Sequence, residues 1–285
     1  MRTRIILIVS ILSAPLLAGG CGSTASGGPK TTTKVVAAFY PLAFAAEQIG
    51  GRHVSVENLT PAGAEPHDLE ISPKSVADIQ SADLVLLLGH GFQKQVESAA
   101  GDGKHVLLLL DTPGLHRFAS GDPHVWLDPV RYALIAERIG KALHRPAATG
   151  AFVRRLEALD SQYKRGLAHC ARREIITSHQ AFGYLGQRYH LNQVAITGLT
   201  PESEATPRDL EHVIETARQT HATTVYFERL VSPRLADTVA REAGAKTDVL
   251  DPIEGLAKGR RDSGESYFTL MRQNLAALRR GLGCR

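Results

Sequence analysis

The chain has 285 residues, which is enough for two domains of ordinary size or for one large one. Hydrophobic residues make up 43% and charged residues 22%, a balance that is typical of a globular protein and excludes a disordered or collagen-like chain. The formal net charge is +4, and no run of Lys and Arg is dense enough to form a phosphate-binding stripe, so we expect no nucleic-acid partner.

Residues 1–20 have the pattern of a secretory signal peptide. Two arginines precede an apolar run from Ile5 to Ala18, which is too short for a transmembrane helix of about 20 residues. Small residues directly before Cys21 resemble a bacterial lipobox, although Leu usually stands where this chain has Ala18. We therefore expect a lipid on the Cys21 thiol. The alternative is an ordinary cleaved signal followed by an unrelated Cys.

Residues 21–33 are rich in Gly, Ser and Thr, a composition that is typical of a flexible tether. We expect this tether to join a folded body to the membrane through the lipid on Cys21. The protein would then be exported, and either anchored to the outer face of the cytoplasmic membrane or periplasmic.

Short runs rich in Val, Ile and Leu alternate with amphipathic stretches from residue 34 onward. The predicted strands are 35–40, 54–59, 83–88 and 105–110 in the first half and 174–177, 193–197, 224–227 and 247–250 in the second. Apolar strands that alternate with helices indicate mainly parallel sheets covered on both faces. The expected fold class is therefore α/β, with two doubly wound lobes of four strands each.

Helix starts are predicted where Ser, Thr or Asp precedes Pro, because the first residue caps a helix and Pro is favoured at its first position. The predicted helices begin at Pro73, Pro129, Pro207 and Pro233. They are expected to end near residues 82, 144, 220 and 243 respectively.

A further helix is predicted over residues 147–169, where apolar residues recur at steps of three and four from Phe152 to Tyr163. About 22 helical residues span roughly 33 Å. We expect this helix to link an N-terminal lobe (34–146) to a C-terminal lobe (170–285) and to limit how far the lobes swing.

The three cysteines are Cys21, Cys170 and Cys284. If Cys21 carries lipid, two remain, and an exported protein meets an oxidising compartment. We therefore expect a Cys170–Cys284 disulfide that ties the C-terminal tail to the second half. The alternative is two unpaired buried thiols.

Four residues of metal-binding types lie beyond the carboxyl ends of predicted strands. They are His67 and His124 in the first half and His179 and Asp251 in the second. Ligands of open α/β sheets bind beyond the carboxyl ends of the strands, so these four could meet between the lobes. Position alone is equally compatible with isolated polar residues at the starts of loops.

Three imidazoles and one carboxylate would suit a single tetrahedral Zn²⁺ ion. Mn²⁺ prefers more oxygen ligands and binds such sites less strongly. The pattern therefore favours Zn²⁺, with Mn²⁺ as the alternative.

Several motifs resemble the zinc/manganese-binding receptors of bacterial ABC transporters, the ZnuA/TroA-like cluster A-I family. They lie at residues 39–41, 66–68, 122–129, 178–184, 227–228 and 250–253, and the similarity runs from about Lys34 to the C-terminus. The resemblance implies two (β/α)₄ lobes joined by a long rigid helix, with one metal ion in the cleft. It also implies delivery of that ion to an ABC permease.

Carried onto this chain, the resemblance implies His67, His124, His179 and Asp251 as the metal ligands. A His at position 179 resembles the zinc-type members. We expect Asp68 and Glu228 to orient imidazoles from outside the ligand set, although Asp68 could equally cap a helix. We also expect the receptor to be a monomer. Two departures from the family are a short segment before His124, with little room for a metal-collecting loop, and Pro66 directly before His67. The second places Glu65 two positions before His67, and we expect it outside the ligand set, either behind the ligands or at the rim of the site.

Other functions remain open on the sequence. A receptor of the same fold for Mn²⁺ or Fe²⁺ is one alternative, and a zinc hydrolase is another. Four protein ligands would leave no position for a catalytic water, so we expect no enzyme. The sequence gives no indication for or against a role as a cell-surface adhesin.

Overall fold

The computed structural model describes residues 32–260 and 263–285. The predicted signal peptide, Cys21 and nearly all of the predicted tether lie outside these ranges. No helix within them is long and apolar enough to cross a membrane.

The strands in the described ranges form two four-stranded sheets in which all neighbours are parallel. The first has the order β2-β1-β3-β4 and the second β6-β5-β7-β8. The strands are β1 (Thr33–Ala37), β2 (Val54–Asn58), β3 (Leu84–Leu87), β4 (Val106–Leu108), β5 (Glu174–Thr177), β6 (Asn192–Ala195), β7 (Thr224–Phe227) and β8 (Lys246–Val249). The predicted α/β class with two four-stranded parallel sheets is confirmed.

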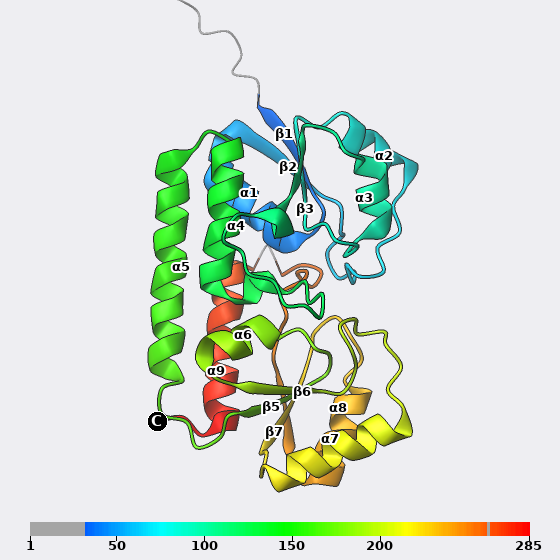
Figure 1. Ribbon diagram of the computed structural model, residues 1–285, viewed down its shortest axis with the longest axis vertical. Helices are drawn as coiled ribbons and strands as arrows, with labels where there is room; N and C mark the ends of the chain where they lie inside the picture. The colour runs from blue at the N-terminus through cyan, green and yellow to red at the C-terminus, as the bar shows by residue number, and fades with distance from the viewer. Residues whose placement is uncertain (1–31, 261–262) are drawn as a thin grey trace, which may run out of the picture. The chain divides into compact units, whose positions relative to one another are not determined.

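Helices cover both faces of each sheet, as Figure 1 shows. Helices α1 and α4 lie on one side of the first sheet, and α2 and α3 lie on the other. The helices are α1 (Tyr40–Gly50), α2 (Pro73–Gln80), α3 (Lys94–Ala100), α4 (Pro129–Ala142), α5 (Pro146–Gly166), α6 (Gly183–Tyr189), α7 (Pro207–Gln219), α8 (Arg234–Ala243) and α9 (Tyr267–Leu282).

The starts of four helices were predicted to within one residue from a polar residue followed by Pro. Ser72 and Thr206 accept hydrogen bonds from the backbone of the first turns of α2 and α7, and Asp128 does the same for α4. At α8 the cap differs, because Pro233 is itself the N-cap residue and the helix begins one residue later. A cap that satisfies free N–H groups thus sets the start of α2, α4 and α7.

Helix α1 begins inside the segment predicted as the first strand. Strand β1 ends at Ala37, and Tyr40 starts the helix with Pro41 in its first turn. The apolar run continues through both elements because α1 is buried along most of its length. A continuous run therefore could not mark where the strand ended.

Helix α5 lies between the two sheets in sequence and contacts α1, α4 and α9. Its apolar residues Phe152, Leu156, Leu159 and Tyr163 are buried, as their spacing predicted. The Tyr163 hydroxyl donates to the carbonyl oxygen of Met271 in α9 at 2.6 Å. Whether α5 acts as a rigid link between lobes stays a prediction.

The predicted disulfide between Cys170 and Cys284 is present. It joins residues 114 apart in sequence, and the two cysteines also form an isolated antiparallel bridge. The end of the chain is thereby fixed beside the segment that leads into β5.

Candidate metal centre

Each clustered side chain comes from a connection that follows the carboxyl end of a strand. His67 lies in the connection between β2 and α2, and His124 precedes a short 3₁₀ helix at Val125–Leu127. His179 follows β5 directly, and Glu254 lies in the segment after β8. The topology therefore delivers side chains from both halves of the chain to one place.

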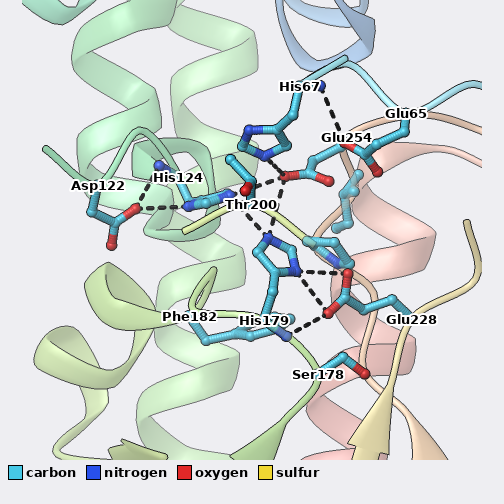
Figure 2. Close-up of polar contacts among 12 residues, drawn as sticks. Glu65, His67, Asp122, His124, Ser178, His179, Phe182, Thr200, Glu228 and Glu254 are labelled. Atoms are coloured by element: carbon cyan, nitrogen blue, oxygen red, sulfur yellow. Dashed lines mark hydrogen bonds and ion pairs between the residues drawn. The ribbon is translucent and has the colours of Figure 1, made fainter. Parts of the chain in front are cut away.

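Figure 2 shows three imidazoles and one carboxylate turned toward a common centre. His67, His124, His179 and Glu254 each offer one metal-binding atom, and these atoms all lie within 4.8 Å of one another. We call these four residues the His₃Glu cluster. His124, His179 and Glu254 are buried, and the His67 side chain is only 5% exposed.

Four of the six distances within the His₃Glu cluster are close to those around a small tetrahedral ion. Glu254 Oε1 lies 3.0 Å from His67 Nε2, 3.0 Å from His124 Nε2 and 3.7 Å from His179 Nε2. The Nε2 atoms of His124 and His179 are 3.2 Å apart. A tetrahedral Zn²⁺ with bonds of about 2.0–2.1 Å separates its ligand atoms by roughly 3.3 Å.

Carboxylates outside the His₃Glu cluster orient two of its imidazoles in the same way. Asp122 Oδ1 accepts from the backbone N–H of His124 at 2.9 Å and from its Nδ1 at 2.7 Å. Glu228 Oε1 accepts from the backbone N–H of His179 at 3.1 Å and from its Nδ1 at 2.7 Å. Because a carboxylate accepts, each Nδ1 carries a proton and Nε2 is left to bind a metal.

His67 is held differently and borders open space. Its backbone N–H donates to Glu65 Oε1 at 3.3 Å, and its ring packs against the edge of Phe92 with centroids 4.8 Å apart. It lines a cavity of about 650 Å³ together with Phe92 and Leu199. His124 and His179, by contrast, are fully buried.

The fourth position differs from the sequence expectation. The structure gathers Glu254, and not Asp251, with the three imidazoles. Asp251 Oδ1 accepts from the N–H of Ile253 at 2.8 Å, and Oδ2 lies 3.1 Å from Arg229 Nε. Asp251 thus closes a tight turn, and Ile253 adopts a φ of 58° that brings the following residue to the imidazoles.

The two predicted orienting residues have different surroundings. Glu228 contacts His179 as described, whereas Asp68 is exposed at the mouth of the 650 Å³ cavity. Asp122 and Glu254 were not expected from the sequence to take part. Asp122 stands two residues before a candidate His in a Pro-containing turn, and that spacing was the available signal.

Burial and close contact set the protonation of the cluster. Burial alone would raise the pKa of the Glu254 carboxyl, but the three imidazoles outweigh it and hold that pKa well below its usual range. Burial alone would lower the pKa of His179, but Glu228 and Glu254 raise it to about 10. His179 is therefore protonated at neutral pH beside an ionised Glu254.

Glu65 lies beside the cluster as a neutral acid. Burial, followed by the charge of Glu254, raises the pKa of its carboxyl to about 9. A protonated carboxyl is a poor metal ligand. Glu65 contacts the backbone of His67 and is not among the four clustered residues.

Comparison with known proteins agrees with this geometry. The model of the family described as "Zinc-uptake complex component A periplasmic" (ZnuA) matches residues 35–281. The chain belongs to the ZnuA family. The high-affinity zinc uptake system protein ZnuA of Bacillus subtilis is 33% identical, with 94% of each chain covered.

One curated relative is considerably longer than this chain. The zinc-binding lipoprotein AdcA of Streptococcus pneumoniae is 33% identical over 98% of this chain, which spans 61% of AdcA. The Zn(II)-bound ZnuA-like domain of that AdcA has a TM-score of 0.75 at 33% identity, covering 88% of this chain and 99% of the domain. The laminin-binding protein Lmb of Streptococcus agalactiae, described as bifunctional with adhesin and metal-transporting activity, has a TM-score of 0.80 at 28% identity. That match covers 88% of this chain and 99% of Lmb.

Proposed function

We propose that this chain is an extracytoplasmic receptor that captures one Zn²⁺ ion and delivers it to an ABC permease for uptake. The observation that carries the proposal is the His₃Glu cluster, in which three Nε2 atoms and one carboxylate oxygen from both halves of the chain converge. The relatives of this chain include a zinc-binding lipoprotein and a zinc uptake protein.

The chemistry of the cluster favours zinc as the cargo. Three imidazole nitrogens and one carboxylate oxygen suit tetrahedral Zn²⁺, whereas Mn²⁺ prefers more oxygen ligands and a higher coordination number. Four protein ligands fill a tetrahedron and leave no position for a reactive water, so we propose a binding role and no catalysis. Binding would displace the protons that the metal-free cluster holds.

Location and partners complete the proposal. We propose that residues 1–20 are removed, that Cys21 carries a lipid, and that residues 21–33 tether the folded body to the outer face of the membrane. The receptor would then act as a monomer beside its permease.

The test is metal analysis of protein purified without chelator, followed by competition titration. We expect about one zinc per chain, and preference for Zn²⁺ over Mn²⁺. His124→Ala should purify with little or no zinc, because it removes a buried ligand and leaves three. A wild-type protein that takes up Mn²⁺ in preference to Zn²⁺ would overturn the choice of cargo.

The same titration assigns the fourth ligand. Glu254→Gln should weaken zinc binding severely, whereas Asp251→Asn keeps the cluster intact and should bind zinc much more tightly than Glu254→Gln. The two substitutions are matched, since each replaces one buried carboxylate by its amide in the same segment. The opposite ranking would show that zinc recruits Asp251, as the sequence predicted.

A further inference from the structure

The segment from His179 to Tyr184 supplies one residue of the candidate site and also contacts the loop that leads to another. His179 belongs to the His₃Glu cluster, and Tyr184 lies five residues later in the first turn of α6, fully buried. The Tyr184 hydroxyl accepts from the backbone N–H of Phe118 at 3.0 Å and donates to the carbonyl oxygen of Asp122 at 3.1 Å. One hydroxyl thus binds both ends of the loop that leads to His124.

The surroundings of Tyr184 fix this loop further. The ring of Phe118 stacks on that of Tyr184, with centroids 4.2 Å apart and an interplanar angle of 4°. The guanidinium of Arg131 lies 4.7 Å from the Tyr184 ring centroid. A Cβ at Gly183 would lie 2.7 Å from Asp122 Oδ2, so the first residue of α6 permits a close approach that a larger residue would obstruct.

Most residues of the loop before His124 are exposed to solvent. Residues 116, 117 and 119–121 are exposed, while Phe118 is half-buried and Asp122 is buried. The contacts with Tyr184 are therefore main anchors of the segment just before Asp122. Asp122 in turn holds both the backbone and the ring of His124.

From this chain of contacts we propose that Tyr184 is a positioning residue for zinc capture. Its hydroxyl holds the main chain of Asp122, and Asp122 holds the imidazole of His124. The same short segment carries His179, so a helix of the second half positions a ligand of the first half. This inference rests on the proposed zinc-binding function.

The matched test compares Tyr184→Phe with Tyr189→Phe. Tyr189 ends the same helix, is also buried, and donates its hydroxyl to Asp160 Oδ1 in α5 at 3.2 Å. Both variants lose one buried hydroxyl, but only Tyr184 touches the loop before His124. Each holo protein is mixed with excess chelator, and the rate of zinc release is measured. Amide exchange at Phe118 is followed in the metal-free protein, and thermal unfolding reports any general loss of stability.

We expect Tyr184→Phe to release zinc about 3- to 10-fold faster, less than the 10- to 100-fold typical of losing a direct carboxylate partner. Exchange at Phe118 should also be faster, because its N–H loses its acceptor. Tyr189→Phe should leave both quantities near wild type. Equal release rates and equal Phe118 exchange in the two variants would overturn the proposal. If the wild type bound no zinc, the proposed function would fail, and Phe118 exchange would still decide whether Tyr184 holds the loop.

Discussion

Two imidazoles of the cluster are each held by a carboxylate that accepts two hydrogen bonds from its histidine. Asp122 and Glu228 each accept from the backbone N–H and the Nδ1 of one histidine. This double contact fixes ring orientation and directs Nε2 at the cluster. A negative charge beside the imidazole also makes it a stronger metal ligand.

At the residue scale, Glu228→Gln is expected to lower zinc affinity by about 10- to 100-fold, because the His179 ring loses its charged partner. Glu215→Gln, an exposed residue on α7, is the control and should bind zinc as the wild type does. Isothermal titration with a competing chelator measures both affinities. Equal affinities in the two variants would contradict the role given to Glu228.

The three histidines could be predicted as site candidates, because each lies in a connection that follows a predicted strand and within a motif that resembles the family. The choice between Asp251 and Glu254 could not, because both follow β8 within a few residues. It depends on the turn that Asp251 closes and on the positive φ of Ile253. Neither is visible in the order of residues.

Helices with a polar cap before Pro were predicted to within a few residues, because the cap and the Pro act locally. Helix α9 was not predicted, although Ser266 caps it and accepts from the N–H of Thr269 at 3.3 Å. Its buried face includes Tyr267 and Phe268, which belong to a core formed with distant residues. Long-range packing of this kind leaves no short sequence pattern.

The close contact of α4 with α5 depends on a glycine. A Cβ at Gly140 would lie 1.8 Å from Thr149 Oγ1, whereas a Cβ at Gly150 would lie 3.4 Å from Arg154 Nη1. Gly140→Ala should therefore lower the free energy of unfolding by about 1–3 kcal/mol through overpacking. Gly150→Ala should raise it by up to about 1 kcal/mol, since Ala favours the helix. Urea unfolding measures both, and a stabilised Gly140→Ala would refute this account of the contact.

For the whole molecule, a cluster whose members come from both halves links zinc binding to stability. An ion that binds only the folded protein stabilises it by about 2.7 kcal/mol at 100 times its Kd. For a domain of this size we expect a rise in Tm of about 5–10 °C. Differential scanning calorimetry with and without zinc checks this, with Glu254→Gln as the control. A Tm that rises equally in that variant would mean that zinc stabilises the protein elsewhere.

The first turn of α9 has a consequence for any attempt to divide the protein. The Tyr267 hydroxyl donates to the carbonyl oxygen of Trp126, and the Phe268 ring packs against Phe44 and Phe152. Helix α9 thus completes the hydrophobic core of the half that is synthesised first. A fragment truncated after α5 would expose the rings of Phe44 and Phe152 to water and would be expected to aggregate. Residues 267 and 268 must therefore be synthesised before the core around Phe44 and Phe152 can close.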